Sequence, residues 1–257
     1  MRVRIQNSVI VVTPTIGSDK LLDAMQSVED QKYANVKHLL VIDGPEHLQA
    51  VAEVAKKVKS NGSELNTIKT PYMVLPFNVG GNGFYGHRVY AAIGHLVNSD
   101  YVAFLDEDNW YEPDHISTLV DEIETNPEHE FVYSYRKIWS PDKSSCVEDN
   151  CESLGMWPVW VAPQDQTLRP STLVDTSSYL FKRTFLEKCG HIWNSGWGAD
   201  RKFFQTVTQN LHVKNYSTFK HTLNYRLDGN PNSVDMDFFI RGNEFMRQHY
   251  GELPWKS

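Results

Sequence analysis

This sequence contains few cysteines, no excess of positive charge and no long apolar run. Its three cysteines, Cys146, Cys151 and Cys189, lack the paired spacing of a structural zinc site, so we expect free thiols; a Cys146–Cys151 disulfide would need an oxidising compartment. The 25 basic and 32 acidic side chains give a formal charge of −7, which argues against a general binder of nucleic acid or anionic membranes. No apolar run approaches the roughly 18 residues of a membrane span, and the stretch after Ser8 is too short for a secretory signal. These absences predict a soluble, cytoplasmic protein with no nucleic-acid partner and no membrane span.

The chain does contain a regular alternation of short β-branched runs with segments of helical period. Its 40% hydrophobic and 12% aromatic content is ordinary for a protein with a substantial core. The alternation over the first hundred residues predicts βαβ units, and hence the α/β class with a mostly parallel central sheet flanked by helices. Strands are expected at residues 9–13, 36–42, 66–70, 101–105, 131–135, 177–181 and 212–216. Helices are expected around residues 21–28, 51–58, 89–97, 116–123, 184–188, 200–209 and 234–250.

Periodicity is lost between residues 139 and 170, a stretch with several prolines and two of the cysteines. A loop of this length in a compact domain is usually a functional lid or a binding loop, with disorder as the alternative. The tryptophans Trp139, Trp157 and Trp160 favour ordered packing. We therefore expect an irregular but ordered segment here.

The strongest functional feature is an apolar strand that stops abruptly in Asp106, Glu107 and Asp108. Residues two apart in a strand point the same way, so Asp106 and Asp108 should share one side while Glu107 faces the other. Divalent ions such as Mg²⁺ bind through one or two carboxylates and leave positions for substrate phosphates. The pattern predicts half of a cation site for a diphosphate substrate. A solvated turn or helix cap is the alternative, and we favour it less because crowded like charges repel.

Polar residues also follow the ends of the first two predicted strands, as Thr13-Pro14-Thr15 and Asp43. In open α/β sheets, ligands bind outside the carboxyl ends of the strands, so these residues should converge with the acids on one crevice. The two hydroxyls could meet a nucleotide, and Asp43 could accept hydrogen bonds from its base. Ordinary turn chemistry explains both equally well.

Four glycines lie between Asn78 and Arg88, ahead of a predicted helix, and allow close backbone approach to a ligand. A dinucleotide fingerprint would follow the first strand, whereas this loop follows the third, so we exclude a Rossmann dehydrogenase. A positive charge in the first turn of a helix is unfavourable for the helix dipole. Arg88 is therefore a candidate phosphate partner, with an ordinary surface arginine as the alternative.

Taken in order, these motifs resemble the inverting glycosyltransferases of the GT-A fold, family 2 in particular, over most of residues 8–230. The family runs from a Thr-Pro-Thr type turn, through a strand-end Asp at the nucleobase and an Asn-x-Gly…Arg segment, to a metal-binding D-x-D. The resemblance implies Mn²⁺ or Mg²⁺ as cofactor, bound directly by Asp108, while Asp106 holds the ribose or the metal's waters. The implied nucleotide and donor contacts are Thr13, Pro14, Thr15, Asp43, Asn78, Gly80, Arg88, Asp106 and Glu107.

The resemblance also assigns a catalytic base, a carboxylate at the start of a helix after a Gly/Trp-rich turn. Gly196-Trp197-Gly198-Ala199-Asp200 is similar to that element and makes Asp200 the base, although family members often have Glu-Asp where this chain has Ala199-Asp200. A simple helix cap is the alternative for Asp200. His221 lies where some GT-A enzymes supply a histidine to the metal, and a surface histidine is the alternative.

Three further residues are candidates for acceptor binding. Asp175 precedes a strand in the half where the family lines its acceptor pocket, although a Ser/Thr/Asp cluster is usually a turn. Trp157 and Trp197 could stack on sugar faces, with core or lid packing as the alternative.

The resemblance implies a metal-dependent inverting glycosyltransferase of the hexosyltransferase type. It would move a sugar from a nucleoside-diphosphate donor, with UDP favoured, to a hydroxyl of a saccharide or glycoconjugate in glycan biosynthesis. The chain lacks the Gln-x-x-Arg-Trp element and membrane helices of processive members, so single transfers are expected. We expect one GT-A domain over residues 1–257, with a nucleotide-sugar half (1–109), an acceptor and catalytic half (110–230) and a C-terminal helix (231–257).

Two other function classes remain open. One is a nucleotide-sugar-binding protein without turnover. The other is a sugar nucleotidyltransferase, which normally carries a basic glycine-rich loop directly after its first strand. The turn at residues 13–19 of this chain is short and lacks that basic cluster.

Overall fold

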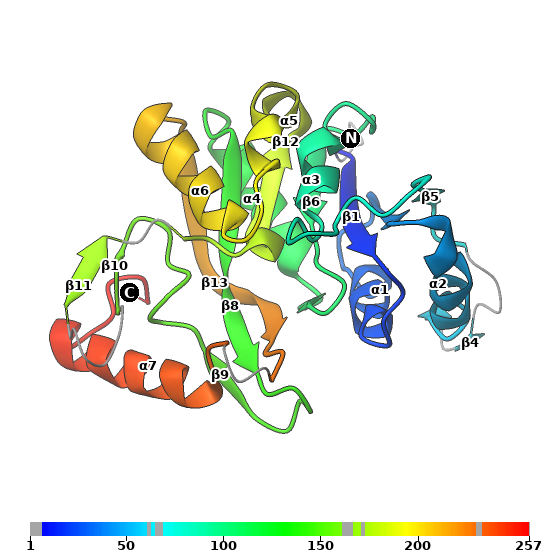
Figure 1. Ribbon diagram of the computed structural model, residues 1–257. Helices are drawn as coiled ribbons and strands as arrows, with labels where there is room; N and C mark the ends of the chain where they lie inside the picture. The colour runs from blue at the N-terminus through cyan, green and yellow to red at the C-terminus, as the bar shows by residue number, and fades with distance from the viewer. Residues whose placement is uncertain are drawn as a thin grey trace, which may run out of the picture.

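The computed structural model describes residues 7–60, 63–64, 69–160, 167–170, 173–229 and 233–256. A central sheet has the order β5-β2-β1-β6-β12-β8-β13-β7, with β9 added to β8 (Figure 1). Its strands are β1 (Val9–Thr15), β2 (Val36–Ile42), β5 (Tyr72–Val74), β6 (Tyr101–Phe104), β7 (Trp110–Tyr111), β8 (Phe131–Trp139), β9 (Cys146–Glu148), β12 (Tyr179–Lys182) and β13 (Asn215–Arg226). Two small antiparallel pairs are separate from it: β3 (Lys59–Ser60) with β4 (Ser63–Glu64), and β10 (Pro158–Trp160) with β11 (Leu168–Pro170).

The sheet is parallel in its first half and mixed in its second. Strands β5, β2, β1 and β6 all pair in parallel, as the βαβ pattern predicts. Strand β12 runs antiparallel to both β6 and β8, and β7 runs antiparallel to β13, while β8 and β13 are parallel. The carboxyl ends of β1, β2 and β6 therefore meet at one edge, where the motifs of the first hundred residues gather.

Two predicted strands differ from the strands that the structure describes. The strand expected at 66–70 falls largely on residues 65–68, which lie outside the described residues, and the described strand nearby is β5. The strand expected at 212–216 is much longer and extends to Arg226. Register shifts between Ser217, His221 and Leu223 interrupt its alternation, which is why a period-two pattern does not reveal it.

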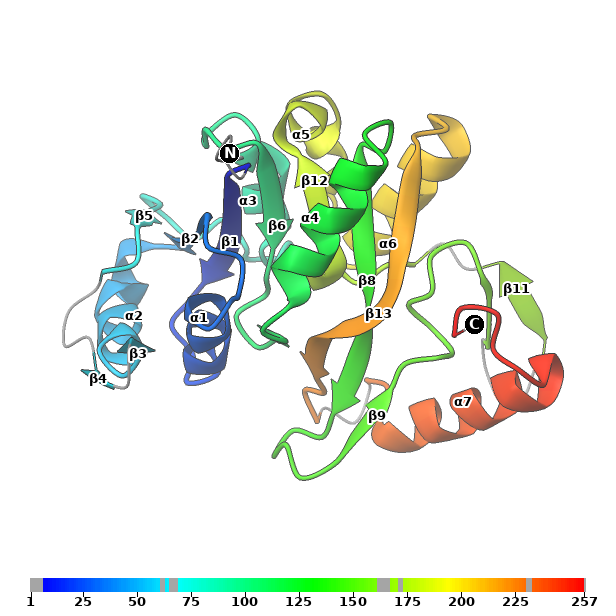
Figure 2. The ribbon, with the colours of Figure 1, turned by 180° about the vertical axis from the view of Figure 1, so that it is seen from behind.

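Helices cover both faces of the sheet. They are α1 (Leu21–Glu29), α2 (Leu48–Ala55), α3 (His87–Ile93), α4 (His115–Thr125), α5 (Arg183–Cys189), α6 (Ala199–Gln205) and α7 (Met236–Tyr250). Short turns of other helical types are η1 (Pro45–His47), η2 (Thr176–Ser178), η3 (Gly190–Trp193) and η4 (Thr206–Asn210). Helices α3, α5 and α6 lie on one face, and α4 lies on the other (Figures 1 and 2).

Strand β6 shows why the sheet needs helices on both faces. Val102 and Phe104 pack into the cluster beneath α3 and α5, while Tyr101 and Ala103 pack into the cluster beneath α4. All four are buried, so the strand reads as a continuous apolar run, as expected for a strand covered on both faces. Its rigid packing fixes the position of the acids that follow.

The segment predicted to be irregular is ordered where it is described, and its tryptophans pack as expected. The ring of Trp157 lies 5.5 Å from that of Trp255, and the ring of Trp160 lies 4.8 Å from that of Phe238. Helix α7 lies against the β10–β11 pair (Figure 1). In the described part of the chain, no helix has the length and apolar character that crossing a membrane requires. The three cysteines, all within that part, carry free thiols.

Candidate active site

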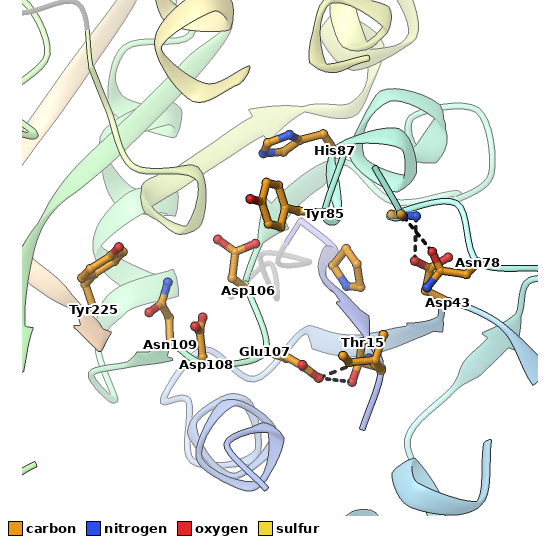
Figure 3. Close-up of a pocket in the computed structure, with 15 residues that line it drawn as sticks. Thr15, Asp43, Asn78, Tyr85, His87, Asp106, Glu107, Asp108, Asn109 and Tyr225 are labelled. Atoms are coloured by element: carbon orange, nitrogen blue, oxygen red, sulfur yellow. Dashed lines mark hydrogen bonds between the residues drawn. The ribbon is translucent and has the colours of Figure 1, made fainter. Parts of the chain in front are cut away.

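A cavity of about 470 Å³ opens at the carboxyl ends of β1, β2 and β6 (Figure 3). Eight residues predicted from the sequence line it: Pro14, Thr15, Asp43, Asn78, Gly80, Asp106, Glu107 and Asp108. Its other lining residues are Ile16, Gly81, Tyr85, Gly86, His87, Asn109 and Tyr225. The described lining thus includes four acidic side chains and neither lysine nor arginine. A cavity of this charge attracts cations and repels anions.

Asp106 is half-buried at the end of β6 and has a neutral donor at each carboxylate oxygen. The Tyr90 hydroxyl donates to Oδ1 at 2.8 Å, and the Ser177 hydroxyl donates to Oδ2 at 3.2 Å. Burial raises the pKa of Asp106 to about 8, with the charges of Asp108 and Asp175 acting in the same direction. Without a cation nearby, this carboxyl therefore holds its proton at neutral pH.

Asp108 shares the side of Asp106, and Glu107 points the opposite way (Figure 3). Glu107 and Asp108 lie in a turn, because β6 ends at Phe104. Burial raises the pKa of Asp108, and this rise is partly offset by Lys20, whose ammonium lies 4.0 Å from the carboxylate. Glu107 instead accepts hydrogen bonds from the Thr15 hydroxyl at 2.5 Å and from the backbone N–H of Ile16 at 3.3 Å. Glu107 therefore ties the end of β6 to the turn after β1.

Asp43 anchors the glycine-rich loop. Its two carboxylate oxygens accept the backbone N–H groups of Val79 at 2.7 Å and Gly80 at 2.8 Å. A Cβ on Gly80 would lie 2.2 Å from the carbonyl oxygen of Tyr85 and 2.7 Å from Asp43 Oδ2, so only glycine fits. Asn78 closes the same loop, since its Oδ1 accepts the N–H of Gly81 at 2.7 Å.

Seven predicted residues lie outside the cavity lining. They are Thr13, Arg88 and His221, together with Asp200, Asp175, Trp157 and Trp197. The hydroxyl of Thr13 is buried 2.9 Å from His38 Nε2. Arg88 is exposed, stacks 3.5 Å from the ring centre of Phe84 and donates to the carbonyl of Val79 at 3.0 Å. His221 lies on β13 with Nε2 3.2 Å from the carbonyl of Asp149 and its ring 5.5 Å from that of Tyr135.

Asp200 lies in the first turn of α6, directly after Ala199 and the left-handed Gly198 (φ 79°). Its side chain is half-buried, and its Oδ1 accepts the backbone N–H of Arg201 at 2.7 Å. Burial raises the pKa of Asp200, and the neighbouring Asp175 raises it further. The charge of Asp175 also raises the pKa of Asp106, so Asp175 acts on both Asp200 and the acid cluster.

Asp175 itself is buried in an ion-pair network centred on Arg136 of β8. The guanidinium donates to Asp175 at 2.7 Å, to Asp149 at 2.8 Å and to Glu152. The second oxygen of Asp175 accepts the backbone N–H of Ser177 at 2.9 Å. Asp175 is thus held by Arg136 and holds Ser177 in turn, and it does not line the cavity.

The two tryptophans proposed for acceptor binding have different surroundings. Trp157 packs against Trp255, away from the cavity lining. Trp197 is 88% exposed at the entry to α6. Its neighbour Gly196 lies against the glycine-rich loop, since a Cβ added at Gly196 would lie 3.1 Å from the carbonyl oxygen of Gly83.

Several lining residues were not anticipated from the sequence. His87 enters the cavity from the start of α3, with Nδ1 3.0 Å from the carbonyl of Ser195, and burial lowers its pKa. Tyr225 enters from the bulged strand β13, and its ring lies 4.6 Å from the guanidinium carbon of Arg136. Asn109 also lines the cavity, and its position directly after the three acids was the sequence signal that could have identified it.

The chemistry of the donor set fits a divalent cation. Asp106 and Asp108 present carboxylate oxygens to one cavity, and a hard cation uses one or two carboxylates with phosphate and water in its other positions. Within the described residues, no group of three or more His, Cys, Asp or Glu side chains is arranged to hold a metal by itself. The residues therefore suit a cation that binds together with a phosphate-bearing substrate.

Comparison with known proteins relates the fold to solved structures. A model of the family described as "Glycosyl transferase family 2" matches residues 8–190. Two crystal structures of S. aureus TarS 1–349 share 15% identity with this chain, and TM-scores are 0.55 for one and 0.56 for the one in complex with UDP-GlcNAc. The alignments cover 85% and 94% of this chain but only 60% and 65% of the TarS chains, so the chain spans less than two thirds of their length. The likeness shows a GT-A type fold, as the sequence predicts.

We predict that replacing Asp106 with asparagine stabilises the metal-free protein at alkaline pH. The folded state retains a proton on Asp106 between the unfolded pKa near 3.8 and the folded pKa of about 8, so its stability falls as pH rises through that window. The advantage of Asp106→Asn over the parent should grow by up to about 1.4 kcal/mol per pH unit there. Urea unfolding in EDTA at about pH 5 and pH 8.5 measures it.

The exposed Asp142 provides the control, because hydrogen bonds hold its pKa at about 2 and it does not titrate in this window. Asp142→Asn should leave the pH dependence unchanged. A parent and an Asp106→Asn variant with parallel pH profiles would contradict the assignment.

Proposed function

This chain belongs to glycosyl transferase family 2, and from that membership we propose that it is a metal-dependent inverting glycosyltransferase. It would move a sugar from a nucleoside-diphosphate donor to a hydroxyl acceptor in glycan or glycoconjugate biosynthesis. The observation that carries the proposal is the cavity at the strand ends, with Asp106 and Asp108 on one side and no basic side chain among its described lining residues. Such a cavity accepts a diphosphate only together with a cation.

The nucleotide occupies the end of the cavity formed by Asp43 and the glycine-rich loop. TarS has been crystallised with UDP-GlcNAc, which supports UDP as the base-bearing part of the donor. Asp108 and Asp106 would hold Mn²⁺ or Mg²⁺. When bound, the cation neutralises the charge that develops on the departing diphosphate.

Asp200 acts as the general base that takes the proton from the acceptor hydroxyl. Its raised pKa brings it closer to the operating pH, which suits proton transfer. Residues 1–109 form the donor-binding half, and residues 110–230 supply the base and the acceptor site. Among the acceptor candidates, the exposed Trp197 is free to stack on a sugar, whereas Asp175 and Trp157 are engaged with other side chains.

The transferred sugar is neutral. With the nucleotide at Asp43 and the diphosphate at the acids, the sugar lies toward His87, Asn109 and Tyr225 (Figure 3). His87 is uncharged at neutral pH because burial lowers its pKa. Arg136, behind Tyr225, is occupied by three carboxylates. A carboxylate on the sugar would therefore meet negative charge, and no lysine or arginine among the described lining residues would compensate it.

Turnover of a panel of nucleotide sugars with Mn²⁺ tests the proposed activity. We expect release of a nucleoside diphosphate with at least one donor, and near-complete loss of this release in Asp108→Ala. Asp200→Asn should lower kcat by about 10²–10⁴ while donor affinity stays unchanged, because the base acts only in the chemical step. Lys202→Gln, which changes an exposed side chain of the same helix, is the matched control.

Two results would count against this activity. Release of pyrophosphate would indicate a nucleotidyltransferase. Donor binding without turnover, unaffected by Asp200→Asn, would indicate a binding protein.

Donor charge is tested by comparing the best neutral hexose donor with its own C6 acid, for example UDP-glucose with UDP-glucuronate. We expect kcat/KM for the acid to be at least about tenfold lower, since like-charge repulsion of about 1.4 kcal/mol suffices for that factor. The two donors share the nucleotide and the ring, so only the carboxylate differs. Equal use of both would refute the neutral-sugar assignment and leave the transfer reaction intact.

A further inference from the structure

We propose that Tyr90 and Ser177 are positioning residues that clamp the carboxylate of Asp106 so that its remaining lone pairs face the cation and diphosphate. The inference rests on the proposed function, because it gives these two hydroxyls a role only if Asp106 meets a cation-bound donor. Neither residue lines the cavity. They act on it through Asp106.

The clamp takes one hydrogen bond to each oxygen of Asp106. Tyr90 donates to Oδ1 at 2.8 Å, and Ser177 donates to Oδ2 at 3.2 Å. The Ser177 oxygen also accepts the backbone N–H of Asp106 at 3.0 Å and the side-chain amide of Asn109 at 3.2 Å. Ser177 therefore fixes both the backbone and the side chain of Asp106, while Tyr90 fixes the rotation of the carboxylate.

Both clamp residues are themselves held rigidly. Tyr90 on α3 is fully buried and stacks 4.1 Å from Phe104, the last residue of β6. Ser177 in η2 is fully buried, and its backbone N–H is bound by Asp175, which Arg136 holds in turn. The two hydroxyls come from different elements, α3 and η2, and bind different oxygens of Asp106, so rotation of its carboxylate would break these bonds.

The contrast with Asp175 indicates that this clamp serves a ligand. Asp175 is buried for support, and a guanidinium compensates its charge at 2.7 Å. Asp106 has only neutral donors in the described structure, and two neutral hydrogen bonds do not balance a carboxylate charge. The two hydrogen bonds therefore fix the orientation of the carboxylate, and a cation in the cavity is left to balance its charge.

The chain offers a matched control for each hydroxyl. Ser178 is next to Ser177, is equally buried, and its hydroxyl has no hydrogen-bond partner within the described residues. Tyr179 is fully buried in the same aromatic cluster as Tyr90, and its hydroxyl is also unpartnered there. We therefore pair Ser177→Ala with Ser178→Ala, and Tyr90→Phe with Tyr179→Phe. Both variants of a pair lose a hydroxyl oxygen, but only the first loses a hydrogen bond to Asp106.

Calorimetric titration of Mn²⁺ into the full chain with saturating UDP measures the effect. We expect Ser177→Ala and Tyr90→Phe each to weaken Mn²⁺ binding by about tenfold or more, since residues that orient a metal-binding carboxylate typically contribute roughly 10–100-fold. Ser178→Ala and Tyr179→Phe should stay within about twofold of the parent. The KM for the donor should rise in the first pair and not in the second.

Parent-like Mn²⁺ affinity in both clamp variants would overturn the proposal, and so would an equal loss in the two controls, which would indicate a packing effect. If Ser177→Ala does not fold, Tyr90→Phe and its control decide alone. A parent that binds neither UDP nor Mn²⁺ would overturn the proposed function itself, a result that the variants cannot mimic.

Discussion

The pair of carboxyl groups beyond the end of β6 is the constraint on which the rest of this site depends. Asp106 and Asp108 share one side of the strand end, and the described cavity lining offers them no lysine or arginine. The neighbouring Lys20 approaches Asp108 only to 4.0 Å and is itself partly exposed. Like charges would repel a diphosphate from such a cavity, and this repulsion is the reason for our proposal that a cation binds together with the donor.

The surrounding structure holds that charge in place. Strand β6 is buried on both faces, so the acids begin at a fixed point. Glu107 points away from the two aspartates and accepts a hydrogen bond from the turn after β1. Asp43 holds the glycine-rich loop by accepting two of its backbone N–H groups. One strand end thus supplies both the site and its attachment to the neighbouring loops.

Strand periodicity allowed much of the site to be predicted, because alternation and parallel pairing are local rules. Parallel pairing brings Asp43, Gly80 and the acids that follow β6 to the same edge. Alternation predicted that Asp106 and Asp108 lie together, although in the structure a turn follows the strand there. The rules do not extend to Tyr90, whose role depends on the rotation of α3. Arg88 lies outside the lining for the same reason, since it follows His87 on that helix and turns toward Phe84. Tyr225 of β13 was missed because the bulges of this strand hide its alternation.

The affinity of the protein for UDP, measured by calorimetry once with Mn²⁺ and once with EDTA, tests the central claim most directly. The account predicts binding at least about tenfold tighter with Mn²⁺, a difference of about 1.4 kcal/mol or more. Equal affinity under the two conditions would contradict it, because the acids would then accommodate a diphosphate without any cation.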